Sequence, residues 1–340
     1  MIFEKVPYFI AEISANHLGK LSIARRLVEA AAEAKADAIK LQTYTPQSMT
    51  LDIDAPHFRV SPGHPLWGGR SLFDLYTQAQ TPRDWHQELF ELANDLGLDA
   101  FSTPFDESAV DFLESLNVPA YKVASLEIVD LPLIERIGQT GKPILISTGA
   151  ASLQEISEAV SVAKQAGSAK VIPLVCTSSY PAQPSDAHLR RIPVLQEIFG
   201  SAVGLSDHTL GAGVSTAGIA LGATVVEKHL TLDRALGGAD AEFSMEPQEF
   251  RQLVQYGKEA HEALGSPSHF QSQSEAESIR LRPSLYIVFD VEEGGLVSSE
   301  NVASLRPSGG LPPKAFLEAK GRKFKGSFPA GTPLTWDLLT

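Results

Sequence analysis

Residues 99–125 read DAFSTPFDESAVDFLESLNVPAYKVAS. Two short apolar runs, Asp99–Phe105 and Ala120–Ser125, flank the stretch Ser108–Leu116, in which apolar residues recur at three- and four-residue spacing. Compact apolar runs are typical of short buried strands, and that spacing is typical of an amphipathic helix. The segment therefore predicts a strand, a crossover helix and a second strand, and strands joined in this way pair in parallel.

The same unit recurs along most of the chain. Eight apolar runs have the length of a strand, namely Tyr8–Ser14, Ala38–Tyr44, Asp99–Phe105, Ala120–Ser125, Pro143–Thr148, Val171–Ser178, Ala202–His208 and Thr224–Leu230. Helical stretches separate them, including Ser22–Ala36, Arg83–Leu96, Leu153–Ala166 and Gly211–Leu221. An open doubly wound sheet gives a similar pattern with fewer strands, so eight units favour an α/β fold of the (β/α)8 TIM-barrel type.

Two stretches fall outside this repeat. The connection Thr45–Gln80 is long and rich in Pro, Gly and aromatic residues, and Trp67 and Tyr76 give it apolar surface to pack down, so we expect a lid. After a helix near Pro247–Leu264, the stretch Gly265–Glu277 turns polar and Ser/Gln-rich, as linkers do. We expect a TIM-barrel catalytic domain at 1–264, a linker at 265–283 and a small β-rich domain at 284–340.

Composition narrows the function. The 340 residues are 43% hydrophobic and carry 28 basic and 41 acidic side chains, a net charge of −13. This balance argues against nucleic-acid binding, although a few buried lysines can still make a positive pocket for a small anion. The single cysteine, Cys176, precludes an internal disulfide. No apolar run reaches the roughly 20 residues of a membrane span, and the N-terminal residues lack a signal-peptide layout, so we expect a cytoplasmic protein without a membrane partner.

Polar residues gather where the predicted strands end, and barrel active sites are built at that face. They are Glu12, Lys40, Gln42, Thr103, Lys122, Ser125, Ser147, Ser178, Ser206, His208, Glu227 and His229. Alternation along a strand places residues i and i+2 on one face, which pairs Lys40 with Gln42 and Glu227 with His229. We therefore expect these side chains to share the barrel mouth.

His208 and His229 end neighbouring strands, so their imidazoles can converge on a metal ion and leave coordination positions open. Two histidines are a weak signature by themselves, and Glu12 or Glu227 would supply a carboxylate directly or through water. Six other histidines are interpreted as structural or surface groups, namely His57, His64, His86, His188, His261 and His269.

Lys40 and Lys122 belong to apolar strands, where a lysine is costly unless an anion neutralises it. One interpretation is an internal salt bridge to a glutamate, and the other is a clamp for a phosphate or carboxylate, assisted by strand-end hydroxyls. Cys176 is interpreted as a small core residue rather than a nucleophile. The run Gly237–Asp240 fits either a plain turn or a loop that contacts substrate.

Eight motifs resemble the sialic acid (nonulosonic acid) synthase family in order and spacing, over essentially the whole chain. They are Ile10–Gly19 (IAEISANHLG), Lys40–Thr43 (KLQT), Ser102–Phe105 (STPF), Tyr121–Ser125 (YKVAS), Ile146–Gly149 (ISTG), Cys176–Pro181 (CTSSYP), Gly204–Thr209 (GLSDHT) and Glu227–Leu230 (EKHL). Asn301–Gly310 (NVASLRPSGG) resembles the antifreeze-like, SAF-type domain that ends members of this family. Within the family, the stretch Trp67–Tyr76 (WGGRSLFDLY) and CTSSYP look most similar to pseudaminic acid synthases. Neuraminic acid synthases typically carry Asn where this chain has Ser178, which argues against neuraminic acid.

The resemblance implies an enzyme that condenses phosphoenolpyruvate with 2,4-diacetamido-2,4,6-trideoxy-L-altrose, giving pseudaminic acid and phosphate. It implies that His208 and His229 hold a divalent ion, with Mn²⁺ favoured over Mg²⁺ or Co²⁺, and that Glu12 and Glu227 lie near the metal and the reacting carbon. It places Lys40, Thr103, Lys122, Ser125, Ser147, Ser178 and Ser206 around phosphoenolpyruvate. It places Gln42, Tyr180, Asp240 and Arg306 around the sugar. It also implies a domain-exchanged homodimer, in which Arg306 reaches the active site of the other subunit.

Three alternatives stay open at this point. A synthase for neuraminic or legionaminic acid would use the same reaction with another N-acetylated sugar. A metal-dependent barrel hydrolase would also use histidines at strand ends, but it would not need Lys40 and Lys122 in the same pocket. A non-catalytic carbohydrate-binding protein would have no reason to combine both lysines with His208, His229 and Glu12.

Overall fold

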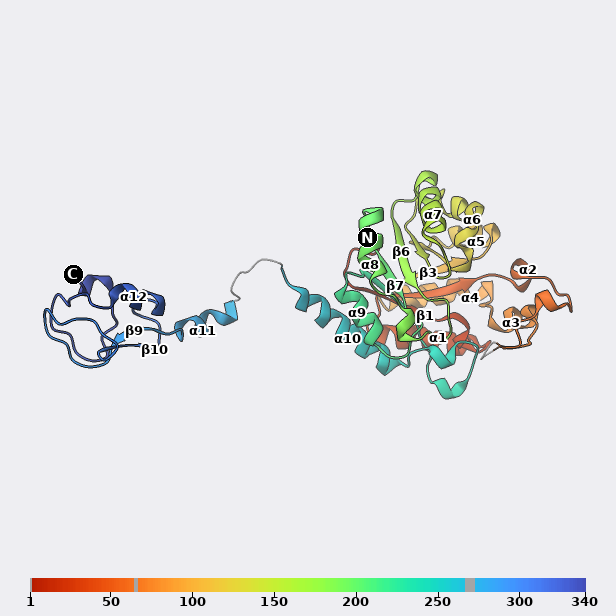
Figure 1. The fold of residues 1–340 in the computed structure, drawn as a ribbon. Helices are drawn as coiled ribbons and strands as arrows, with labels where there is room; N and C mark the ends of the chain where they lie inside the picture. The colour runs from red at the N-terminus through yellow and green to blue at the C-terminus, as the bar shows by residue number, and fades with distance from the viewer. Residues whose placement is uncertain (1, 64–66, 267–272) are drawn as a thin grey trace. The chain divides into compact units, whose positions relative to one another are not determined.

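The computed structural model describes residues 2–63, 67–266 and 273–340. The chain divides into two compact units, Met1–Gly265 and Ser266–Thr340, which are described separately (Figure 1). His64, His269 and short parts of the predicted lid and linker lie outside the described residues. In the part of the chain that is described, no helix is long and apolar enough to span a bilayer.

The first unit is a closed barrel of eight parallel strands, which confirms the predicted fold (Figure 1). The strands are β1 (Tyr8–Glu12), β2 (Ala38–Thr43), β3 (Asp99–Pro104), β4 (Tyr121–Val123), β5 (Ile144–Ser147), β6 (Val171–Cys176), β7 (Gly204–Ser206) and β8 (Val225–His229). They follow one another around the barrel in chain order, and β1 closes it by pairing with both β2 and β8. The register sets Glu12 beside Lys40 on one side and beside His229 on the other.

Helices cover the outside of the barrel. They are α1 (Leu21–Glu33), α4 (Arg83–Asp95), α5 (Glu107–Ser115), α6 (Leu131–Gly138), α7 (Leu153–Ala166), α8 (Arg191–Phe199), α9 (Gly213–Ala220) and α10 (Pro247–Leu264). Helix α7 shows how the sequence sets the bounds: Ser152 and Glu155 form a capping box at its start, and Gly167 ends it with a left-handed φ of 119°. Apolar faces of most of these helices pack on the strands in one large core, and that of α8 packs against β6 and β7 in a second, smaller cluster.

The connection between β2 and β3 carries α2 (Pro46–Met49) and α3 (Leu72–Ala79). Its aromatic residues pack onto the barrel unit, as the sequence predicts. The ring of Tyr76 meets that of Tyr44 edge-on at 5.7 Å between centroids, and Trp67 lies 6.1 Å from Tyr180. We call this connection the lid.

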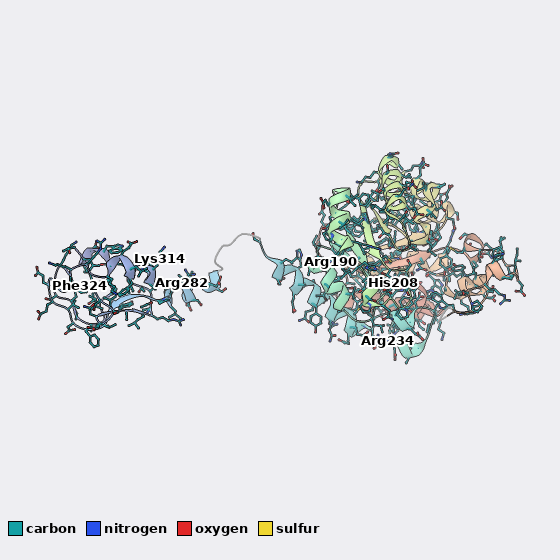
Figure 2. All side chains as sticks on the ribbon, in the orientation of Figure 1. Arg190, His208, Arg234, Arg282, Lys314 and Phe324 are labelled. Carbon is teal, nitrogen blue, oxygen red and sulfur yellow. The ribbon has the colours of Figure 1, made fainter. Side chains whose placement is uncertain are left out.

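The second unit has a small core of its own. Strands β9 (Ser284–Ile287) and β10 (Val302–Leu305) pair antiparallel, and isolated bridges tie the surrounding turns to them. Helix α12 (Phe316–Ala319) lies in this unit, and α11 (Ala276–Arg280) lies in the stretch that the sequence predicts as a linker. Phe324, Leu285 and Leu334 are at most 1% exposed (Figure 2). Its charged residues are at the surface, including Arg282 and Lys314 (Figure 2).

Candidate active site

A small cavity of about 60 Å³ lies where the eight strands end. Most of the predicted site residues line it, namely Glu12, Lys40, Gln42, Thr103, Lys122, Ser125, Ser147, Ser206, His208, Glu227 and His229. Tyr180 lines it as well, although it follows β6 by four residues. We call this cavity the reaction pocket. Ser178, Asp240 and Arg306 are the predicted site residues that do not line it.

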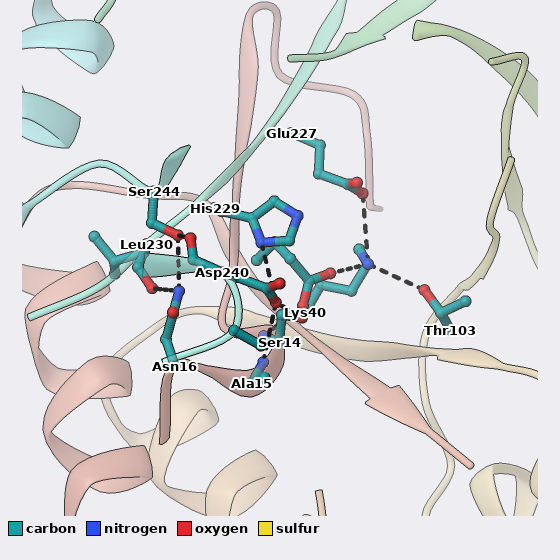
Figure 3. Close-up of polar contacts among 12 residues, drawn as sticks. Ser14, Ala15, Asn16, Lys40, Thr103, Glu227, His229, Leu230, Asp240 and Ser244 are labelled. Carbon is teal, nitrogen blue, oxygen red and sulfur yellow. Dashed lines mark hydrogen bonds and ion pairs between the residues drawn. The ribbon is translucent and has the colours of Figure 1, made fainter. Parts of the chain in front are cut away.

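Four buried charged residues line the reaction pocket, and Figure 3 shows two of them, Lys40 and Glu227. Lys40 Nζ forms an ion pair with Glu12 Oε2 and lies 3.8 Å from Glu227 Oε2. Lys122 Nζ lies 3.8 Å from the other oxygen of Glu227. Lys40 also donates to Thr103 Oγ1 at 3.0 Å, whereas the direct hydrogen bond of Lys122 goes to a backbone carbonyl. The internal salt bridge expected as one interpretation is therefore present, and Lys122 keeps donors for a ligand.

The two glutamates differ in their electrostatics. Burial raises the pKa of Glu12 to about 7, with Glu227 adding to the rise and Lys40 opposing it. Burial also acts to raise the pKa of Glu227, but Lys122 and Lys40 outweigh it and hold that pKa below its usual value. Near neutral pH, Glu227 is thus ionised while Glu12 exchanges a proton readily, which leaves the pocket short of negative charge. An entering anion would supply that charge.

Serine hydroxyls form a cradle around Gly149, just after β5. Ser147 Oγ and Ser178 Oγ are buried and have no hydrogen-bond partner in the described residues. A Cβ placed on Gly149 would come within 2.3 Å of Ser178 Oγ and 2.8 Å of Ser125 Oγ, so the hydroxyls close over a position that only glycine leaves open. Because buried hydroxyls without partners are costly, this cradle is suited to an oxygen-rich ligand. Ser178 therefore belongs to the site, although it does not line the reaction pocket.

His208 and His229 converge on the opposite side, with 5.4 Å between their ring centroids. The Nδ1 atom of His208 lies 3.0 Å from the carbonyl oxygen of Thr177 and donates to it, so Nε2 is the nitrogen available to a ligand when the ring is neutral. Burial lowers the pKa of His208, but Cys176 beside it outweighs burial and raises that pKa above its ordinary value, so binding of a metal ion would require the ring to lose a proton. Among the described residues, His229 Nδ1 has no hydrogen-bond partner, and it lies 3.9 Å from Asp240 Oδ2 (Figure 3). Burial, and then the nearby His208, lower the pKa of His229 well below its ordinary value, so its imidazole is neutral.

This donor set fits a divalent ion with open coordination positions. Within residues 2–63, 67–266 and 273–340, no three His, Cys, Asp or Glu side chains are grouped as a complete metal site. Two neutral-capable imidazoles, one with an orphaned buried nitrogen, would supply two ligands, and water and substrate would supply the others. Such an incomplete protein shell is what a catalytic metal requires, in contrast to a structural one.

Asp240 and Tyr180 mark the outer side of the pocket. Asp240 accepts a hydrogen bond from Ser14 Oγ, which ties the loop after β8 to the turn after β1 (Figure 3). The ring of Tyr180 lies 4.6 Å from that of His208. The run Gly237–Asp240 is therefore more than a plain turn, because it fixes a carboxylate beside His229. Arg306 is an exposed residue of the second unit, directly after β10.

Each of the two units matches the model of a known protein family. Residues 27–269 match the model of the NeuB family, and residues 282–340 match that of the SAF domain. The chain belongs to the NeuB family. This agrees with the resemblance inferred from its motifs.

Relatives match this NeuB-family chain over nearly its whole length. The pseudaminic acid synthase of Helicobacter pylori is 41% identical, and the match covers 97% of each chain. The N,N'-diacetyllegionaminic acid synthase of Legionella pneumophila is 35% identical, over 98% of this chain and 94% of the relative. The crystal structure of N-acetylneuraminic acid synthetase from Leptospira borgpetersenii, in complex with citrate, has a TM-score of 0.72 and 33% identity, covering 82% of this chain and 91% of that one.

Sequence analysis missed one network that holds the site of this NeuB-family member in place. Lys228 Nζ forms a fully buried ion pair with Asp207 Oδ2 at 2.9 Å and donates to the carbonyl oxygen of Thr209 at 2.6 Å. Asp207 also accepts hydrogen bonds from Ser215 and Thr209. The network lies on the outer side of the strands, and it fixes the corner that carries His208. Alternation was the available signal, because Lys228 must point away from its neighbours Glu227 and His229.

Sequence analysis found no signal for Glu127, and it indicated only a core position for Cys176. Glu127, after β4, is half-buried; burial raises the pKa of its carboxyl, while Lys122 opposes the rise. Cys176 is buried as expected, but it lines the reaction pocket, where Ser125 Oγ donates to its sulfur at 3.5 Å. His86 agrees with the structural interpretation, since its ring bonds Thr43 Oγ1 and the carbonyl oxygen of Pro82.

Proposed function

We propose that this chain is a pseudaminic acid synthase, which condenses phosphoenolpyruvate with 2,4-diacetamido-2,4,6-trideoxy-L-altrose and releases phosphate. One observation carries the proposal: two buried lysines, several hydroxyls and a pair of imidazoles gather at one small pocket, and two of the hydroxyls there have no partner among the described residues. An anionic reactant fits the first side, and a carbonyl that must be polarised fits the second. Relatives with this activity support the choice of product.

Phosphoenolpyruvate would lie between Lys40, Lys122 and the hydroxyl cradle. Its phosphate and carboxylate need several donors at once, and Thr103, Ser125, Ser147, Ser178 and Ser206 provide hydroxyls there. These contacts hold the nucleophilic methylene carbon toward the sugar aldehyde. Such positioning lowers the entropic part of the barrier for joining two molecules.

His208 and His229 would hold a divalent ion, with Mn²⁺ favoured and Mg²⁺ or Co²⁺ as alternatives. When bound, that ion supplies Lewis acidity toward the carbonyl oxygen of the open-chain sugar. Gln42, Tyr180 and Asp240 would orient the sugar so that its C1 faces the methylene carbon of phosphoenolpyruvate. Asp240 Oδ2 lies 3.9 Å from His229 Nδ1, so its carboxylate stands beside the proposed metal ligand without a direct hydrogen bond to it.

Carbon–carbon bond formation uses the enol electron pair and leaves positive character on the carbon that bears the phosphate. Water then adds to this carbon, and the resulting tetrahedral species expels phosphate to give the keto acid. Glu12, with its pKa raised to about 7 by burial, is suited to take the proton of that water near neutral pH. Ionised Glu227 would stabilise the positive character before water adds.

We further propose a domain-exchanged homodimer in the cytoplasm. The family resemblance supports an arrangement in which the partner subunit's Arg306 completes the sugar site. Arg306 is exposed in its own unit, as a residue that contacts another subunit must be before assembly. The single cysteine and the use of phosphoenolpyruvate support a reducing compartment.

Gly149→Ala should raise the KM for phosphoenolpyruvate by at least about ten-fold, because the new methyl group would press on the hydroxyls of Ser125 and Ser178. The KM for the sugar should change little. Steady-state kinetics with each substrate varied in turn would measure this difference. Gly213→Ala is the matched control, since a Cβ there meets nothing within 4 Å. An equal rise in both KM values would contradict the assignment of the cradle to the phosphoenolpyruvate site.

Arg306→Ala should raise the KM for the sugar by about ten-fold and leave the KM for phosphoenolpyruvate unchanged, since losing a hydrogen bond to a charged group costs about 1.5–3 kcal/mol. Mixing this variant with a barrel-inactive variant gives a second readout. If each subunit completes the site of the other, the mixture should regain sugar affinity in a fraction of its sites. A rise confined to the KM for phosphoenolpyruvate would contradict the exchanged arrangement.

The proposed function is tested by phosphate release from phosphoenolpyruvate with added Mn²⁺. The sugars offered separately are 2,4-diacetamido-2,4,6-trideoxy-L-altrose, N-acetylmannosamine and 2,4-diacetamido-2,4,6-trideoxymannose. Release with the altrose sugar alone is the expected result. Release with another sugar only would keep the reaction and change the product to neuraminic or legionaminic acid. If no phosphate is released with any of the three sugars, the proposal is rejected.

A further inference from the structure

A second, larger cavity of about 640 Å³ lies in the barrel unit beside the reaction pocket. The turn after β1, helix α3 of the lid and the loop after β8 contribute its walls. We call it the lid cavity. Its size is that of a typical small-molecule site, and it is much larger than the reaction pocket of about 60 Å³. With phosphoenolpyruvate in the reaction pocket, only the reacting end of the sugar can lie there, and the rest of the sugar must lie elsewhere.

The two cavities adjoin at one pair of aromatic rings. Tyr180 lines the reaction pocket, Trp67 lines the lid cavity, and their ring centroids are 6.1 Å apart. Trp67 Nε1 donates to the carbonyl oxygen of Ala239 at 3.2 Å, next to Asp240. A sugar whose C1 lies beside His208 and extends past Tyr180 would therefore direct its far end into the lid cavity.

The lining of the lid cavity combines apolar and polar groups. Leu18, Leu75 and Trp67 provide apolar surface. Arg70 bonds the side chain of Gln78 at 2.6 Å, and in residues 2–63, 67–266 and 273–340 it forms no ion pair with an acidic side chain. In the same described ranges, the carboxylate of Glu242 has neither a hydrogen-bond nor an ion-pair partner.

An acetamido group matches this set of partners. Its carbonyl oxygen needs a donor, its N–H needs an acceptor and its methyl group needs apolar contact, and the guanidinium, the carboxylate and the leucines supply them in turn. A free anion would meet Glu242, and a cation would meet Arg70, so a neutral amide suits the cavity better than either. The acetamido group at C2 adjoins the reacting carbon and stays near the reaction pocket. The group at C4 is two carbons farther out.

We propose that the lid cavity binds the C4 acetamido group of the sugar, with Arg70 donating to its carbonyl oxygen. This inference rests on the proposed function and extends it, because it names Arg70, Glu242 and Trp67 as the residues that select a 2,4-diacetamido sugar over one with a single acetamido group. The lid stretch Trp67–Tyr76 thereby gains a role in specificity rather than only in covering the barrel.

The test compares two sugars in the full-length protein. One is 2,4-diacetamido-2,4,6-trideoxy-L-altrose, and the other is its analogue with a hydroxyl group at C4. Arg70→Ala should lower kcat/KM for the diacetamido sugar on the order of ten- to a hundred-fold, as expected when a hydrogen bond to a charged group is lost. It should leave kcat/KM for the analogue and the KM for phosphoenolpyruvate unchanged. Arg25→Ala is the matched control, because Arg25 is an exposed arginine of α1, pairs with Glu88 and does not line the cavity.

Three results would overturn the proposal. They are an equal loss of kcat/KM with both sugars, an equal loss in Arg70→Ala and in the control variant, and an unchanged ratio of kcat/KM between the two sugars. Light scattering provides a second readout: if Arg70→Ala dissociates an oligomer and keeps the sugar discrimination, the cavity is an interface with another copy of the chain and the proposal is wrong. If the wild-type protein releases no phosphate with the diacetamido sugar, the proposed function itself fails, and the assignment of the cavity falls with it.

Discussion

His229→Ala should lower turnover by at least about a thousand-fold if His208 and His229 hold the proposed divalent ion, because losing one of two imidazole ligands would remove several kcal/mol of Lewis-acid stabilisation. The fold should survive. His229 ends β8 beside an open cavity, and its Nδ1 has no hydrogen-bond partner to lose. Phosphate release at saturating substrate measures turnover, elemental analysis of the dialysed protein measures bound manganese, and thermal unfolding reports on the fold.

The control for this variant is His261→Ala, at an exposed position of α10. It should keep full turnover and full manganese content. Near-normal turnover in His229→Ala would reject the metal assignment. Loss of turnover with unchanged manganese content would instead make His229 a residue that acts on the substrate, and the ligands would have to be sought elsewhere.

The barrel was predictable because its signal is local. Each strand carries its own apolar run and each helix its own periodicity, so the bounds of β1, β2 and β3 differ from the predicted runs by two residues or fewer. Most of the site residues were then predictable because active sites of such barrels lie where the strands end. Lys40, Thr103 and His229 line one pocket because parallel strands all end at one face.

Features that depend on contacts between distant segments were not predictable in this way. The lid cavity requires Trp67 to meet Ala239, and 172 residues separate them in the sequence. The cradle at Gly149 depends on where the hydroxyl of Ser178 lies, which no spacing reveals. The pKa values of Glu12 and Glu227 differ because two lysines act on Glu227, whereas buried Glu12 has one lysine and the carboxylate of Glu227 beside it, and these neighbours are known only from coordinates.

Lys228→Met should lower the free energy of unfolding of the barrel by about 3–5 kcal/mol, the usual cost of removing one partner from a buried ion pair. Lys228 and Asp207 have side chains no more than 1% exposed, so the remaining carboxylate cannot recover its charge stabilisation from water. Urea unfolding followed by circular dichroism at 222 nm measures the change, since nearly all the described helices belong to the barrel unit.

Two further variants separate charge burial from lost packing. Lys142→Met removes an ion pair with Glu114 whose side chains are 21% and 34% exposed, so it should cost less than about 1 kcal/mol. Asp207→Asn combined with Lys228→Met should be less destabilising than Lys228→Met alone, because no unpaired charge is left inside. If Lys228→Met costs no more than Lys142→Met, the ion pair does not anchor the corner after β7. The position of His208 would then have to be held by its hydrogen bond to Thr177 and by the packing of Tyr180 against its ring.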